Sequence, residues 1–177
     1  LFECVADTCP DRTALVVLDA DGTKTIQTYA GLDARANQLA SWLRTRNVGP
    51  GDHVGLHLYN GMPYVEALLA LCKLRAVPIN INYRYVTEEL AYLFADADLV
   101  GLIHEPDLAD VVDGAREGIA KLGWTLSSGA PYDAAVASGN PARDFGPRSP
   151  DDLYIIYTGG TTGMPKGVMW RHEDLFF

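Results

Sequence analysis

The chain contains 177 residues, of which 48% are hydrophobic and 21% are charged, a composition typical of one globular domain with a core. Lysine and arginine together number 14 against 23 acidic residues, so the formal net charge is −9. A polyanion needs clustered basic side chains, and this balance therefore excludes nucleic acid as the expected partner. One local loop can still bind a small anion against the overall charge.

The cysteines and the apolar segments narrow the class further. Cys4, Cys9 and Cys72 form neither a disulfide framework nor a metal-ligand spacing, which favours free thiols in a reducing cytoplasm. The longest strongly apolar run, residues 67–72, is far shorter than the roughly 20 residues of a transmembrane helix, so no such segment is predicted. Because the first residue is Leu1 and not methionine, we expect a piece of a longer protein.

In chain order, the pattern begins with a predicted hairpin and continues with alternating helices and strands. The run at 14–18 followed by Asp21-Gly22 predicts a hairpin, and Thr28 is expected to cap a helix with one apolar stripe. Asn60 is expected to cap the next helix. Strands are predicted at 53–59, 76–81, 99–103, 153–157 and 167–170, and helices at 64–74, 87–94 and 107–122, with a helical turn at 132–137 inside a surface connection over 123–152.

This alternation predicts an α/β fold with a mainly parallel sheet and helices on both faces. The helix at 64–74 is apolar nearly all round and is expected to be buried. Strands in such a sheet place the loops that follow them at one edge, where open α/β sheets bind ligands.

The run YTGGTTGMPKG, from Tyr157 to Gly167, follows the last of the buried strands. Glycines allow successive backbone amides to turn toward one anion in a nest, and threonine hydroxyls and a lysine ammonium add donors and charge. The run therefore predicts a loop that cradles a phosphate chain. The residues predicted to contact the phosphates are Thr158, Gly159, Gly160, Thr161, Thr162, Gly163, Lys166 and Gly167.

This run differs from two common phosphate-binding motifs. A Walker-type loop needs glycine directly before the lysine and serine or threonine after it, whereas Lys166 lies between Pro165 and Gly167. The dinucleotide fingerprint G-x-G-x-x-G is also absent from the sequence. A flexible connector is the other interpretation, but connectors rarely combine threonine, proline and lysine directly after a buried strand.

YTGGTTGMPKG resembles the phosphate-binding signature of the adenylate-forming superfamily, which contains acyl-CoA synthetases, luciferases and nonribosomal adenylation domains. Gly159 stands where that family commonly has serine, which removes one hydroxyl. The flanking runs at 76–85 and 167–176 resemble actinobacterial acyl-CoA synthetases that act on fatty or steroid side-chain acids. Thr28-Tyr29-Ala30 also resembles the start of the family's first helix, although Gly31 replaces a usual glutamate.

The resemblance implies an acid–thiol ligase that uses ATP, magnesium and coenzyme A. A carboxylate attacks the α-phosphate of ATP, and coenzyme A then displaces AMP to form a thioester. The loop would hold the β- and γ-phosphates, which leave as pyrophosphate. The implied partners are thus a fatty or steroid side-chain acid, ATP and coenzyme A, and a homodimer is compatible with the sequence.

The same resemblance implies that residues 1–177 are the first, incomplete part of the large N-terminal domain, without the C-terminal domain. The family's adenine-stacking aromatic, ribose-binding aspartate and adenylating lysine all follow the loop in sequence, so no catalytic residue is assigned here. We expect this chain alone not to catalyse the reaction. A non-catalytic nucleotide-binding or regulatory module, and an adenylating enzyme of the luciferase or amino-acid-activating type, stay open as alternatives.

Several further residues have structural interpretations that we favour over functional ones. His53 and His57 are expected to be neutral, half-buried strand residues, since no third metal ligand is near, and no metal site is predicted. For His172 a structural role is at least as well supported as a catalytic one. The remaining expectations are packing and surface positions for Tyr83, Arg84 and Tyr85, a core position for Trp170, and a solvated acidic face for Asp96, Asp98, Asp107, Asp110 and Asp113.

Overall fold

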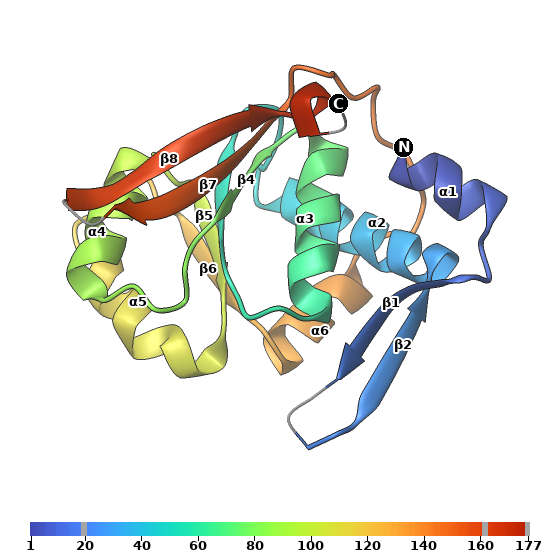
Figure 1. Cartoon of the computed structure of the whole chain (residues 1–177), viewed down its shortest axis with the longest axis horizontal. Helices are drawn as coiled ribbons and strands as arrows, with labels where there is room; N and C mark the ends of the chain where they lie inside the picture. Colours follow the sequence, from blue (N-terminus) through green and yellow to red (C-terminus); the bar gives the residue numbers. More distant parts are fainter. Residues whose placement is uncertain (19–20, 161–162, 176–177) are drawn as a thin grey trace.

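The structure is a computed structural model that describes residues 1–18, 21–160 and 163–175. Figure 1 shows a central sheet with helices on both of its faces and a hairpin that projects from one end of the molecule. The helices are α1 (Phe2–Thr8), α2 (Tyr29–Thr45), α3 (Met62–Leu74), α4 (Thr87–Asp96), α5 (Ala109–Arg116) and α6 (Ala130–Ser138), with 3-10 turns at Pro106–Leu108 and Glu173–Leu175.

Two sheets are formed by the described residues. The projecting hairpin consists of β1 (Thr13–Leu18) and β2 (Lys24–Thr28) and forms a sheet of its own. The central sheet has the order β6-β5-β3-β4-β7-β8, and its strands are β3 (His53–His57), β4 (Val77–Asn80), β5 (Gly101–His104), β6 (Trp124–Ser127), β7 (Leu153–Gly160) and β8 (Gly163–Arg171). Its neighbours pair in parallel except β7 and β8, which are antiparallel. The predicted fold class is confirmed.

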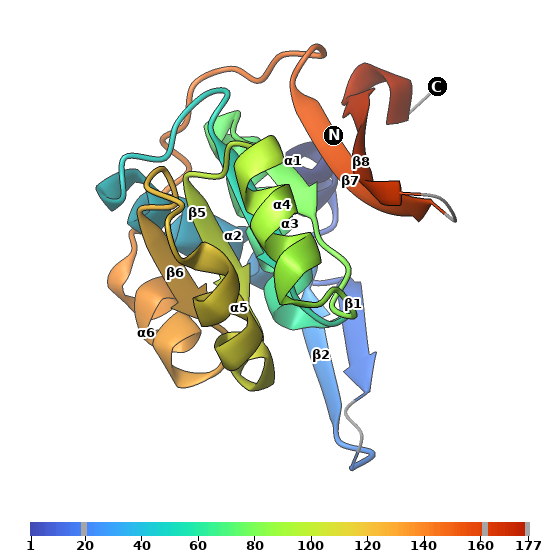
Figure 2. The same ribbon diagram turned by 90° about the vertical axis from the view of Figure 1, so that its left-hand side faces the viewer.

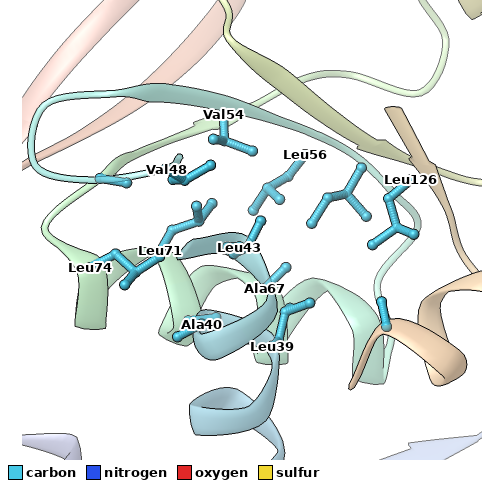
Figure 3. Packing of buried hydrophobic residues seen from close by; sticks show 14 of the residues in the cluster. Leu39, Ala40, Leu43, Val48, Val54, Leu56, Ala67, Leu71, Leu74 and Leu126 are labelled. Atoms are coloured by element: carbon cyan, nitrogen blue, oxygen red, sulfur yellow. The ribbon is translucent and has the colours of Figure 1, made fainter. Parts of the chain in front are cut away.

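Each face of the central sheet carries its own hydrophobic core. On one face, Val54 and Leu56 of β3 pack against Leu43 of α2 and Leu71 of α3, as Figure 3 shows. The opposite face packs against α4 and α5, whose covering position is clear in Figure 2. Burial of large apolar side chains at these two layers is the main favourable contribution to folding.

Local signals in the sequence place several element boundaries. The Thr28 hydroxyl accepts a hydrogen bond from the Gly31 amide at 3.1 Å, which confirms the predicted cap of α2. The predicted cap at Asn60 is wrong, because Gly61 is the N-cap residue of α3 and Pro63 lies in the first turn. The helix predicted over 107–122 is also wrong in length, since the chain leaves helical geometry at Glu117 and Gly118 has φ +80°.

The buried face of the α3 helix is not purely apolar, in contrast to the expectation from the sequence. Glu66 and Lys73 are its charged buried residues, and both are paired. The Lys73 ammonium lies 2.7 Å from a Glu3 carboxylate oxygen and 2.8 Å from one of Asp33, and Glu66 pairs with Arg35. These contacts tie α1, α2 and α3 together, because a buried charge is tolerated only when it is paired.

Candidate phosphate-binding site

The predicted phosphate-binding run forms a hairpin rather than a free loop. Tyr157 pairs with Gly167, Thr158 with Lys166, and Gly160 with Gly163 across the two antiparallel strands. The prediction that a loop begins at Tyr157 is therefore wrong, because pairing with β8 extends β7 to Gly160. Thr158 and Lys166 are opposite each other, so the hydroxyl and the ammonium group lie on the same face of the hairpin.

A β-bulge lies next to this pair. Between the Thr158 and Gly160 pairs, one residue of β7 is opposed by two residues of β8, Met164 and Pro165. Pro165 is buried and has no amide hydrogen to donate to the ladder, which explains why regular pairing stops there. Thr158, Gly159, Gly163 and Lys166 are exposed, so the tip can be reached from solvent.

The glycines do not form the predicted nest in the described part of this segment. Gly159, Gly163 and Gly167 all lack the left-handed φ that such a concavity requires. Thr161 and Thr162, which complete the predicted contact set, lie outside the described residues. Gly160 and Gly163 are paired across the hairpin, and Gly167 is paired with Tyr157, so the extended geometry of these strands explains the difference at the paired positions.

Gly167 has a packing reason of its own. A Cβ atom at this position would lie 3.1 Å from Cγ2 of Ile155 and 3.1 Å from Cε2 of Tyr157. The Tyr157 hydroxyl donates a hydrogen bond to Asp96 at the end of α4, at 2.6 Å. Burial, followed by this hydrogen bond, raises the pKa of Tyr157 well above its usual value, so the phenol stays neutral. The Tyr157 ring thus packs the hairpin against the hydrophobic core that lies under α4 and α5.

The hairpin is also held at its root, far from the tip. Asp152 precedes β7, is 8% exposed, and accepts hydrogen bonds from the Arg75 guanidinium at 2.9–3.1 Å and from the Ser149 amide at 2.9 Å. Arg75 itself follows α3 with φ +58°, a left-handed conformation that is uncommon outside glycine. On β8, Arg171 pairs with Asp151 at 3.1 Å. The base of the hairpin is therefore fixed by charge pairs from both strands.

Comparison with known proteins establishes the family of the chain that carries this hairpin. The sequence profile of the family described as AMP-binding enzyme matches residues 2–177. The chain belongs to the AMP-binding enzyme family. The profile spans nearly the whole chain, and so the resemblance carried by YTGGTTGMPKG is confirmed.

Relatives within this family include named acyl-CoA ligases. The chain is 46% identical to a 3-oxocholest-4-en-26-oate–CoA ligase of Rhodococcus rhodochrous, with 99% of this chain and 33% of that protein covered. It is 42% identical to a medium/long-chain-fatty-acid–CoA/3-oxocholest-4-en-26-oate–CoA ligase of Mycobacterium marinum, with 99% and 34% covered. The chain therefore spans about one third of the length of the curated relatives it matches.

Solved structures of family members have the same fold. A Mycobacterium tuberculosis fatty acyl CoA synthetase superimposes with a TM-score of 0.86 at 25% identity, over 97% of this chain and 34% of that one. The parallel sheet, its helices and the antiparallel β7–β8 pair are thus those of the AMP-binding fold.

A groove of about 500 Å³ lies between α3 and β7 and is also lined by residues of α1. The Tyr64 hydroxyl on α3 and the Tyr154 hydroxyl on β7 lie 3.0 Å apart within it, and Nε2 of His172 is 3.8 Å from Sγ of Cys72. Burial raises the pKa of Cys72 to about 11 and lowers that of His172, which keeps both groups neutral.

The predicted core position of Trp170 is wrong, since 42% of its surface is exposed on β8.

The other predicted histidines have no arrangement suited to catalysis. His57 is fully buried, not half-buried, and burial lowers its pKa to about 4, so it is neutral. His53 Nδ1 is 2.6 Å from the Ala97 carbonyl oxygen. No group of three or more histidine, cysteine, aspartate or glutamate side chains within 1–18, 21–160 and 163–175 is placed to hold a metal. Over the same residues, no helix combines the length and apolar character that crossing a membrane requires.

Sequence reasoning missed the residues that position the hairpin. Asp96 was interpreted only as part of a solvated acidic face, and neither Arg75 nor Asp152 was singled out. A signal did exist for Arg75. Helices commonly end with a left-handed residue, usually glycine, and no glycine follows α3, so another residue there can take that conformation. No local pattern could have paired Tyr157 with Asp96, which lie 61 positions apart.

Proposed function

We propose that this chain carries the ATP phosphate-binding part of an acyl-CoA ligase. In the proposed reaction a carboxylate oxygen attacks the α-phosphorus of ATP, and the bond from that phosphorus to the bridging oxygen breaks to release pyrophosphate. The thiol of coenzyme A then attacks the acyl carbon, and AMP leaves with its carboxyl-derived oxygen. Membership of the AMP-binding family and the ligase names of relatives support the proposal.

The observation that carries the proposal is the opposed pair Thr158–Lys166 at the exposed tip of β7–β8. A hydroxyl and an ammonium on one hairpin face offer the donors and the positive charge that a leaving pyrophosphate needs. The neighbouring residues Gly159, Gly160, Gly163 and Gly167, together with Thr161 and Thr162, complete the proposed contact set. Most of the effect expected from this set is positioning and charge stabilisation, since phosphate chemistry needs little covalent help from protein.

The proposed acid substrates are fatty or steroid side-chain acids, because the names of the two relatives above specify those classes. The activity is proposed for a longer protein in which residues 1–177 form the first part of the N-terminal domain. A cytoplasmic location and a homodimeric assembly belong to the same proposal.

Magnesium is proposed as the counterion of the triphosphate. Mg²⁺ commonly binds substrate phosphates together with only one or two carboxylates and several waters. The described residues contain no metal-ligating group of three or more such side chains, so we assign the ion no ligand in this part of the chain.

ATP binding by the purified chain tests the proposal, measured by isothermal titration calorimetry with and without magnesium. Lys166→Met should weaken binding by at least about tenfold, because a charge-assisted contact to phosphate is lost. The matched control is Lys24→Met, since Lys24 is an exposed strand lysine on the other hairpin, β1–β2 (Figure 1).

Equal affinities of wild type and Lys166→Met would remove Lys166 from the site. No detectable binding of ATP by either the wild-type chain or the longer protein would contradict the proposal as a whole. Binding without any ligase activity in the longer protein would favour a non-catalytic nucleotide-binding module.

A further inference from the structure

The Tyr85 side chain is unusual among the aromatic residues of the molecule. It lies in the loop between β4 and α4, is 8% exposed, and its hydroxyl oxygen is fully covered. Within the described part of the chain this hydroxyl has no hydrogen-bond partner. A buried polar group without a partner is unfavourable, and a phenylalanine would fill the same space without that cost. The hydroxyl therefore needs an explanation beyond packing.

The surroundings of this hydroxyl supply the explanation. Strands β4 and β7 pair in parallel, with Ile79 opposite Ile155, so their carboxyl ends lie at the same edge of the sheet. Tyr85 follows the first of these ends and Gly159 lies near the second. A Cβ atom built on Gly159 would be 3.7 Å from the Tyr85 hydroxyl oxygen and 4.0 Å from its Cε1 atom. The unpaired hydroxyl thus lies directly against the proposed phosphate-binding segment.

Two neighbours of Tyr85 in the same loop have no such relation to the hairpin. The Tyr83 ring is 41% exposed and packs edge-on against Tyr59, with ring centroids 5.0 Å apart. The Arg84 guanidinium lies over the Tyr83 ring, with its central carbon 5.4 Å from the ring centroid, within the usual cation–π range. Both residues fit the surface role expected from the sequence, and Tyr85 differs from them.

We propose that Tyr85 donates its hydroxyl hydrogen to a phosphate oxygen of the nucleoside triphosphate bound at Gly159. The inference rests on the proposed function and assigns to that site a contact from outside the YTGGTTGMPKG run. Because residue 159 is glycine, no side chain of this residue lies between the Tyr85 hydroxyl and the proposed phosphate-binding segment. Tyr85 then replaces the hydroxyl that a serine at this position would supply.

The chemistry of the tyrosine suits this role. Burial, followed by the charge of Glu89, raises the pKa of Tyr85, so the phenol keeps its proton at neutral pH. A neutral phenol can donate one hydrogen bond to an anion, and hydrogen bonds to charged acceptors are the stronger kind. The Tyr85 amide donates to the Asn82 carbonyl at 3.1 Å, which helps to hold the loop that carries the ring.

The test combines ATP affinity with thermal unfolding of the full chain, each in the absence and presence of ATP. Tyr85→Phe should raise the dissociation constant for ATP about tenfold, the effect of one hydrogen bond to a charged group. Its melting temperature without ATP should equal or exceed that of the wild type, because an unpaired hydroxyl is removed. The matched control is Tyr83→Phe, which should change neither quantity.

A rescue variant separates the hydroxyl from the loop itself. In the Tyr85→Phe background, Gly159→Ser should restore most of the ATP affinity, whereas Gly159→Ala should not. Both changes fit sterically, since nothing lies closer than 3.7 Å to a Cβ atom at 159.

The outcomes distinguish this inference from the function on which it rests. If the wild type binds ATP and Tyr85→Phe binds it equally well, the role of Tyr85 is overturned and the phosphate site stands. A fall in melting temperature that is the same with and without ATP would show a structural role and would also overturn it. If neither the wild-type chain nor the longer protein binds ATP, both proposals fail.

Discussion

The molecule contains two antiparallel hairpins that differ in how they are attached. The β1–β2 hairpin forms a separate sheet and projects from the body, and its strands are largely exposed (Figure 1). The β7–β8 hairpin continues the central sheet through the parallel pairing of β7 with β4. The exposure of two isoleucines illustrates this contrast. Ile26 on β2 is 54% exposed, whereas Ile155 on β7 is 6% exposed.

This difference makes β7–β8 the hairpin that is better held for the proposed role of positioning a ligand. A hairpin alone is marginally stable, and its tip moves with respect to the rest of the fold unless its root is packed. The root of β7–β8 is held by Asp152 and Arg75, and its middle by the Tyr157–Asp96 hydrogen bond. These contacts leave the exposed tip free to bind while its place on the sheet is fixed, as preorganised sites require.

The largest expected effect comes from shortening the two isoleucines. Ile155→Ala should lower the free energy of unfolding by about 3 kcal/mol, because it leaves a cavity in the core under α4. Ile26→Ala should cost less than about 0.5 kcal/mol, since its side chain is mostly in water. Urea unfolding followed by circular dichroism measures both. Similar costs at the two positions would show that the hairpins are packed alike, contrary to the structure.

A smaller effect is expected at the charged root. Asp152→Asn should cost about 2 kcal/mol at pH 7, because the charge-assisted hydrogen bonds from Arg75 are weakened. Burial alone would raise the pKa of Asp152, but the hydrogen bonds from Arg75 and the Ser149 amide lower it overall. A carboxyl whose pKa is lower in the folded state stabilises the fold above its usual value of about 4 and loses that contribution as the pH falls below it.

The wild type and Asp152→Asn should therefore approach equal stability in urea titrations carried out near pH 3. The control is Asp21→Asn in the exposed turn of β1–β2, where the pKa is also lowered, mainly by a hydrogen bond from the Thr23 backbone amide. This change should alter stability little at either pH. A cost at Asp152 that is independent of pH would mean that packing, not the charge pair, holds the root.

The sequence predicted those parts of the fold that depend on neighbours along the chain. The cap at Thr28, the hairpin around Asp21-Gly22 and the helix from Thr87 all arise from such local signals, and the structure confirms them. Strand β6 was missed inside the supposed connection, because only Leu126 of its four residues is buried and no β-branched run marks it. Helix α1 was missed as well.

The residues of the candidate site stay a prediction from the sequence, and the geometry in which the structure places them was not predicted. The Thr, Gly and Lys types of the run indicated phosphate binding, whereas the pairing that turns the run into a hairpin depends on β4 and α4. The contacts of Arg75 with Asp152 and of Tyr85 with Gly159 join residues more than 70 positions apart. One sequence gives no distance between such residues, and therefore these contacts had to come from the structure.

The smallest expected effect separates two glycines of the same hairpin. Gly167→Ala should lower the free energy of unfolding by about 1 kcal/mol, because the new methyl group would press on Ile155 and Tyr157. Gly159→Ala should be close to neutral, since its nearest neighbour is 3.7 Å away and its φ is not left-handed. If Gly167→Ala proved neutral while ATP binding was lost, Gly167 would serve the ligand directly. Loss of stability with ATP binding retained would instead show that Gly167 has a packing role. The absence of a side chain at this position would then be what allows the Tyr157 ring to pack beside β8.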